Sequence, residues 1–135
     1  MQIVGPIDIE HAVSTALAAS APEGVSVTAY PPPDGISGIT VSIQSLGSFE
    51  QSAVSDAYDL VAYAWAPTYS AAYKTAFWAC TAIRALRFGS FSGVTFNTSE
   101  ARAPYEDPDP ERKTLKRCTV HATVGARGVG FIDHK

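Results

Sequence analysis

Apolar and polar residues alternate along the chain with a period that changes several times, and these changes predict helices and strands. Apolar positions three to four residues apart predict a helix from the N-cap Asp8 to about Ser20. A second helix is predicted over 69–87, with Thr68 as its N-cap and Gly89 at its end. Its apolar stripe consists of Ala72, Ala76, Ala79, Ile83 and Leu86.

Strict alternation of apolar and polar residues predicts half-buried strands over 25–30 and 39–44. Residues 58–66 are apolar on both faces apart from Asp59, which indicates a central strand covered on both sides. A short strand is predicted over 94–97. The last strand is predicted over 114–127, where Cys118, Val120, Ala122 and Val124 alternate with Thr119, His121 and Thr123.

Three segments lack such a pattern. Residues 46–56 are polar and are expected to form a long connection, a kind of segment that often binds partners. Residues 103–111 contain three prolines, which do not fit a strand ladder, and are expected to form a rigid loop. Residues 128–135 are expected to be a flexible C-terminal tail.

The predicted order of elements is α-β-β-β-α-β-β. Strands that follow one another through short connections, with two helices, favour an α+β fold. We expect a mostly antiparallel sheet of about five strands with both helices packed on one face. The 135 residues show no break in composition, so a single domain over 1–135 is expected.

The composition and charge of the chain limit the classes of function that we expect. Charged residues make up 17% of the chain, below the usual share of about 25%, and an obligate interface would account for this shortage. The net charge of −3 and the lack of a long basic run argue against sequence-specific nucleic-acid binding. The chain shows neither a signal-peptide pattern nor an apolar run of membrane-spanning length, so no membrane association is expected.

The residues that could carry chemistry are scattered. The acids Glu106, Asp107, Asp109 and Glu111 alternate with prolines and lack the glycine-permitted turn of a calcium loop. His121 is expected on the strand face opposite Cys118, which leaves no activated nucleophile. Cys80 and Cys118 are expected to be small, reduced core residues. We therefore expect no enzymatic activity, no metal site and no cofactor.

Trp78 lies nearly opposite the apolar stripe of the second predicted helix. Two interpretations remain open for it. Its ring can lie over the surface of its own helix, or it can be an interface contact, because tryptophan is enriched at such positions.

Three segments in a fixed order resemble the tail terminator proteins of long-tailed bacteriophages, and with their spacers they cover most of the chain. The first is the N-terminal helix ending in Ala-Val-Ser-Thr-Ala-Leu17. The second begins Val61-Ala-Tyr-Ala-Trp-Ala-Pro-Thr and runs through Ile83-Arg-Ala-Leu86. The third is Pro104-Tyr-Glu-Asp-Pro-Asp-Pro110, followed by basic residues and a strand ending near Gly128. The family often has an aromatic residue after the arginine of the third segment, where this chain has Arg112-Lys113-Thr114-Leu115.

The resemblance implies a structural virion protein at the head–tail junction, assembled in the host cytoplasm. It implies a homo-oligomer, a hexameric ring, that caps the major tail tube protein and stops its polymerisation. The other ring face would bind the head-side connector (neck) protein, and DNA would pass through the lumen without specific binding. A neighbouring neck or head-completion connector subunit is the first alternative, and a small-ligand-binding or enzymatic α+β domain is the second.

Within that interpretation, the segments 46–56 and 101–112 are the expected contacts between rings. Arg102 and Arg112 are expected to form ion pairs between subunits, around the acids of the third segment. The expected interface residues are Trp78, Arg102, Tyr105, Asp107, Asp109 and Arg112. Replacing Asp107 and Asp109 with alanine is expected to leave the monomer folded and to impair assembly.

Overall fold

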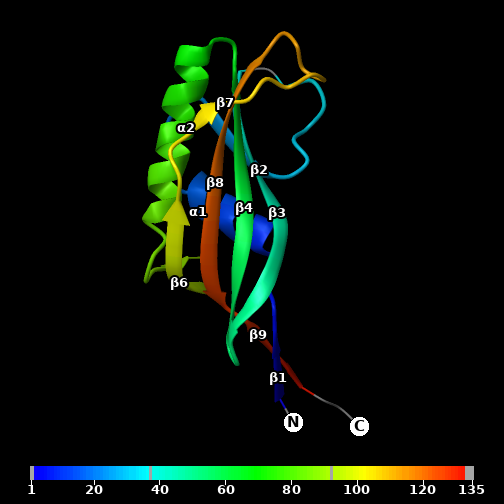
Figure 1. Cartoon of the computed structure of the whole chain (residues 1–135), viewed down its shortest axis with the longest axis vertical. Coiled ribbons are helices and arrows are strands. Elements are labelled where there is room, and N and C mark those ends of the chain that lie inside the picture. The colour runs from blue at the N-terminus through cyan, green and yellow to red at the C-terminus, as the bar shows by residue number, and fades with distance from the viewer. Residues whose placement is uncertain (1, 37, 92, 133–135) are drawn as a thin grey trace.

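The computed structural model describes residues 2–36, 38–91 and 93–132 and shows two helices beside a curled sheet (Figure 1). Along the chain the elements are β1 Gln2–Gly5, α1 Ile9–Ala18, β2 Val25–Ala29, β3 Ile39–Ser52, β4 Ser55–Ala66, α2 Tyr69–Arg84, β5 Ser90–Phe91, β6 Val94–Ala101, β7 Tyr105–Glu106, β8 Lys116–Arg127 and β9 Val129–Ile132.

The main sheet has the strand order β2-β3-β4-β8-β6-β5, with β7 paired to part of β8. The pair β2–β3 is parallel and the other pairs are antiparallel. The predicted α+β class is confirmed, whereas the expected five strands were too few. β4 lies between β3 and β8, as predicted for a central strand, and pairs with β8 over its whole length from Ser55–Arg127 to Ala66–Lys116.

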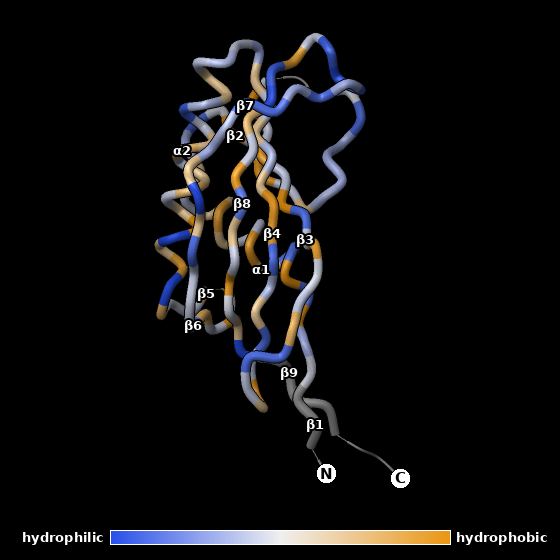
Figure 2. Tube along the Cα trace, viewed as in Figure 1, coloured by the Kyte–Doolittle hydropathy of each residue, from blue (hydrophilic) through white to orange (hydrophobic). Residues whose placement is uncertain are grey.

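Both helices pack on one face of this sheet, and the main cluster of buried apolar residues lies between the helices and the sheet. Figure 2 shows that strands and helices alike contribute apolar residues. The predicted N-caps are confirmed, since the side chain of Asp8 accepts a hydrogen bond from the His11 N–H and Thr68 accepts one from Ala71. In α2, Ala72, Ala76 and Ala79 are fully buried. Their small side chains allow the α2 backbone to approach the sheet closely. The helix is therefore joined to the sheet by close packing of small residues rather than by large buried side chains.

The segment 46–56, predicted as a polar connection, instead forms the end of a long β3–β4 hairpin. Phe49 pairs with Ala57 and Glu50 with Asp56, and a bulge lies between Ser45 and Gly47. Sequence alternation missed these strands because residues 46–54 are exposed whichever face they lie on. Their backbone hydrogen bonds, rather than burial, hold them in the sheet.

The C-terminal prediction also needs correction. Residues 129–132 of the expected flexible tail form β9, which pairs antiparallel with β1 in a separate two-stranded sheet at the end of the molecule (Figure 1). Residues 133–135 lie outside the described part of the chain. Neither strand was predicted, because four residues are too few to show a period.

One outer strand of the sheet is closed by side chains from the end of α2 and from the residues just after it. The guanidinium group of Arg84 donates to the Ala101 carbonyl at 2.6 Å, and that of Arg87 donates to the Ser99 carbonyl at 3.0 Å. These two carbonyls belong to β6 and would otherwise be free to pair with another strand. At the opposite edge, β2 has an uncharged sequence, Val-Ser-Val-Thr-Ala.

Replacing Ala76 with leucine tests the close approach of α2. We expect Ala76→Leu to lower the free energy of unfolding by about 1–3 kcal/mol, because a larger side chain at a fully buried position forces the helix away from the sheet. Urea unfolding measures the change. Ala85→Leu, at an exposed position near the end of the same helix, is the control and should change stability by less than about 0.5 kcal/mol. Equal effects at both positions would contradict the packing described here.

Candidate functional site

The outer face of the sheet, away from the helices, contains a buried tryptophan. Successive residues of a strand point to opposite faces, so Trp65 lies opposite the core residues Ala64 and Ala66. It is nevertheless only 1% exposed. Its indole N–H donates to a carboxylate oxygen of Asp109 at 2.9 Å. Asp109 belongs to residues 107–115, here called the covering loop, which connects β7 with β8.

Asp109 is the centre of the contacts that hold the covering loop. Besides the Trp65 bond, its carboxylate accepts from the Glu111 backbone N–H at 3.0 Å and from Arg112 at 3.2 Å. Arg117 of β8 lies 3.8 Å away. Burial by itself would raise the pKa of Asp109, but the hydrogen bonds and the two guanidinium charges outweigh it and lower this pKa below its usual value. The Asp109 carboxyl group is therefore ionised at neutral pH, and these contacts fix its position.

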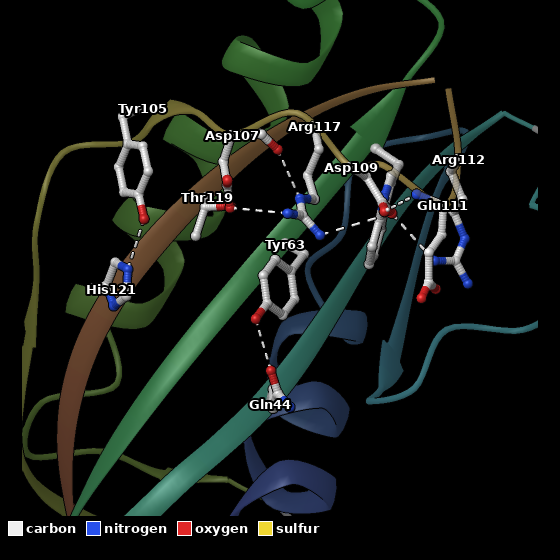
Figure 3. Close-up of polar contacts among 11 residues, drawn as sticks. Gln44, Tyr63, Tyr105, Asp107, Asp109, Glu111, Arg112, Arg117, Thr119 and His121 are labelled. Atoms are coloured by element: carbon white, nitrogen blue, oxygen red, sulfur yellow. Dashed lines mark hydrogen bonds and ion pairs between the residues drawn. The ribbon is translucent and has the colours of Figure 1, made fainter. Parts of the chain in front are cut away.

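A second set of contacts fixes the start of the same loop. Arg117 donates to the Asp107 carbonyl at 2.8 Å and to its carboxylate at 3.1 Å, and Thr119 donates to that carboxylate at 2.9 Å (Figure 3). The guanidinium group of Arg117 also lies over the Tyr63 ring, 4.9 Å from its centroid, and Arg112 lies 5.4 Å from the Trp65 centroid. Cation–π contacts and ion pairs thus join the loop to β4 and β8.

The structure places the expected interface residues in three different environments. Asp107, Asp109 and Arg112 come together, but they bind their own chain through Arg117, Trp65 and each other. Arg112 thus already has an ion pair within the chain. Asp109 is 7% exposed and accepts the Trp65 N–H, so we now expect its replacement to destabilise the monomer as well as to affect assembly.

Arg102 and Tyr105, by contrast, are exposed. The Tyr105 hydroxyl lies 2.8 Å from His121 Nε2, and the two rings are stacked with their planes 3° apart. Trp78 is half-buried and packs against the core. The exposed aromatic residues of α2 are instead Tyr73 and Phe77, whose ring centroids are 4.9 Å apart.

Trp65 and Arg117 were not predicted to have a special role. Trp65 was assigned to an apolar strand and Arg117 to a group of basic residues. One signal was present: an indole N–H on a strand that is apolar on both faces needs a buried acceptor, and acids in a proline-rich loop can supply one.

An open cavity of about 420 Å³ lies on the outer face, below the covering loop. Its charged and polar lining comes from β4, β6, β8 and the residue after β6: Asp59, Glu100, His121, Thr123 and Arg102. Leu46 of β3 also lines it. Asp59 accepts a hydrogen bond from Thr123 at 3.1 Å. As predicted, His121 and Cys118 are on opposite faces, since Cys118 is fully buried and His121 is exposed. The cavity carries charges of both signs and suits a polar side chain or small ligand.

The described residues contain no cluster of three or more histidine, cysteine or acidic residues arranged to hold a metal ion. In the same residues, no helix has the length and apolar character needed to cross a membrane. The sequence matches no protein-family model and shows no significant match to a curated protein. The exposed surfaces of the chain are therefore the structural evidence that bears on its function.

The first variant tests whether Asp109 holds the covering loop. We expect Asp109→Ala to reduce the free energy of unfolding by about 2–4 kcal/mol, because it leaves the buried Trp65 N–H without an acceptor and Arg112 without its ion pair, while Arg117 keeps its pair with Asp107. Both arginines keep some access to solvent, which limits the loss. Urea unfolding measures it. Glu111→Ala, at an exposed position in the same loop, should cost less than about 0.5 kcal/mol. Similar losses for the two variants would contradict the role of Asp109.

The lowered pKa of Asp109 predicts a pH dependence. A carboxyl group whose pKa is lower in the folded than in the unfolded state stabilises the fold above its unfolded pKa of about 3.9, and this contribution is lost as the pH falls. The difference in stability between the wild type and Asp109→Asn should therefore be largest above about pH 5 and shrink towards about pH 3. Thermal unfolding across this range measures it, and a constant difference would contradict the lowered pKa.

Proposed function

We propose that this chain is a ring-forming structural subunit of a long-tailed bacteriophage, a tail terminator that caps the tail tube and joins it to the head-side connector. Three ordered sequence segments that resemble this family support the proposal. The structure contributes a further argument, because large apolar side chains are exposed on the β3–β4 hairpin, on and after α2 and at β7, and are therefore available for assembly.

The observation that carries the proposal is the projecting β3–β4 hairpin. Its end, residues 46–56, extends beyond the strands that pack against the helices (Figure 1). On it, Leu46, Phe49 and Val54 are 56%, 58% and 41% exposed. A hairpin that exposes three large apolar side chains gains free energy when a partner covers them. This is expected of an assembly subunit.

The covering loop and the strand before it give a second contact surface. Trp65, Asp109 and Arg117 hold the loop on the sheet, so its shape is fixed before any partner binds. Such preorganisation reduces the entropy cost of assembly. Arg102 and Tyr105 are exposed near the start of this region and remain free to contact a neighbouring ring. Asp109 supports the contact from within the chain.

In this proposal, a heterologous contact repeated around an axis closes the ring. One face of the ring matches the end of the tail tube, and the other face differs from it, so no further tube subunit can bind. The hexameric number follows from the family resemblance. The net charge of −3 favours passage of DNA through the lumen without strong binding.

A neck connector subunit is the alternative within the same class, since it would use the same kinds of exposed surface. The cavity lined by Asp59, Glu100, Arg102 and His121 favours a second candidate, a small-ligand-binding domain. A ligand that binds there would raise the midpoint of thermal unfolding of a monomeric chain.

The terminator proposal predicts an effect on tube growth. Mixing the chain with polymerising tail-tube protein from the same genome should give shorter tubes with an additional ring at one end, scored by negative-stain electron microscopy. The reason is that a bound ring covers the pairing surface of the growing end. Tubes of unchanged length without an additional ring would contradict the terminator role, and binding to a portal ring instead would favour the neck connector.

A charge reversal tests the second contact surface in the same assay. Arg102→Glu should weaken capping because it changes an exposed contact, while the unfolding midpoint stays within about 2 °C of the wild type. The same charge change at the exposed Lys74 of α2, which belongs to neither contact surface, is the control and should leave capping intact. Equal loss with both variants would indicate a general charge effect rather than a contact at Arg102.

A further inference from the structure

Phe88, just beyond the end of α2, combines an unusual backbone with an unusual exposure. Its φ is +60°, in the left-handed region that bulky side chains rarely adopt. Phe88 is 81% exposed, the largest value among the exposed large apolar residues in the described part of the chain. The chain therefore bears both a strained backbone and an unburied phenyl ring at this position. Strain at such a residue points to a role outside the folding of the isolated chain.

The surroundings of Phe88 are basic and aromatic. Arg84 and Arg87 are exposed beside it, and Phe77, 46% exposed, lies two turns earlier on the same side of α2 as Arg84. The guanidinium groups of both arginines bind carbonyl oxygens of β6, and neither forms an ion pair with another described residue. We call Phe77, Arg84, Arg87 and Phe88 the α2-end surface.

The tip of the β3–β4 hairpin has the opposite charge. Glu50 and Asp56 lie directly across from each other on the two strands, an arrangement that like charges disfavour. No lysine or arginine occurs between positions 1 and 73, so the hairpin supplies no base of its own. Arg127 of β8, opposite Ser55, offsets only part of this charge. The exposed Val54 lies in the turn next to the acids, whereas Phe49, which pairs with Ala57, lies on the opposite face from Glu50.

The two surfaces belong to opposite parts of the sheet. The hairpin connects β3 and β4, whereas the α2-end surface adjoins β5 and β6 on the far side of β8 (Figure 1). Each is unsuited to bind its own kind, because two hairpins bring acids together and two α2 ends bring arginines together. An acidic apolar projection and a basic aromatic surface on one chain are instead complementary between copies.

We propose that the hairpin tip of one copy docks on the α2-end surface of the next copy, with Glu50 and Asp56 facing Arg84 and Arg87, and Phe88 packed against Val54 in the hairpin turn. The inference rests on the proposed ring-forming function and specifies its subunit contact. The contact is heterologous, so repeating it generates either a closed ring or an open filament. In the assembly, the hairpin of the neighbouring copy covers Phe88. This contact explains why Phe88 has a strained backbone and an exposed ring in the isolated chain.

Cysteine cross-linking tests which surfaces meet. Ala53→Cys marks the hairpin tip, Ala85→Cys marks the α2 end while keeping Phe88, and both positions are exposed. The native Cys80 and Cys118 are buried and give little background. Under mild oxidation, an equimolar mixture of the two variants should give at least about tenfold more disulfide-linked heterodimer than homodimer, because docking raises the local thiol concentration.

The comparison variant is Ser26→Cys, at an exposed position on the free edge of β2. Mixed with Ala85→Cys, it should give no more cross-linked product than the wild-type chain, whose two cysteines are buried. Preferential linkage of Ser26→Cys to Ala85→Cys would show that the sheet edge, rather than the hairpin, binds the α2 end, and would overturn the proposal. Equal yields for all pairs, or a predominance of hairpin homodimers, would overturn it as well.

Glu50→Lys distinguishes an effect on docking from an effect on folding, because it should raise the stability of the isolated chain and lower the yield of the cross-link. The substitution removes the repulsion with Asp56 and should raise the unfolding midpoint of the isolated chain. It should also reduce the yield of the Ala53→Cys and Ala85→Cys cross-link about fivefold, since it places a lysine against arginines. Glu23→Lys, at an exposed position just before β2, carries the same charge change and should leave the yield unchanged.

The cross-link reports contact between copies whether or not tail tubes are present. A strong specific cross-link without tube capping would reject the terminator role and retain the subunit contact. Tube capping without this cross-link would retain the terminator role and reject the contact proposed here.

Discussion

The hydrogen bond between the Trp65 indole and the Asp109 carboxylate is the contact that organises the outer face of this protein. The sheet has one face covered by helices, and the other would normally be polar and open to water. A tryptophan on that face is stable only when something covers its ring and accepts its N–H. The covering loop does both, and the same carboxylate draws in Arg112 and Arg117. A loop of charged residues and prolines thereby becomes part of the rigid fold.

The helical face follows a different principle. The buried stripe of α2 is made largely of alanine, so close approach rather than large side chains joins the helix to the sheet. This places the α2 backbone near the outer strand β6, where Arg84 and Arg87 reach its free carbonyls. The edge at β6 is therefore protected from pairing with another strand, and association between copies is directed to side-chain surfaces instead. The projecting hairpin and Phe88 are such surfaces.

Sequence patterns predicted those elements whose burial is asymmetric. Both helices, their caps at Asp8 and Thr68, and the central position of the strand around Val61 follow from periodicity and local hydrogen bonding. The hairpin end was missed because residues exposed on both faces show no alternation, and β1 and β9 were missed because they are too short. The acids of the covering loop were recognised as a group, but their binding partners were not predicted. Trp65, the partner of Asp109, is 44 residues away in the sequence.

The sequence by itself determined the α+β class, the helix boundaries to within a few residues and the separation of His121 from Cys118 across a strand. These properties depend on neighbours within a few positions, and local physics therefore suffices to predict them. Only the tertiary structure decided that Asp109 is buried, that Phe88 is exposed and that residues 46–56 continue a sheet. Burial and charge pairing are properties of residues brought together from distant parts of the chain, and no local pattern encodes which acid meets which tryptophan or arginine.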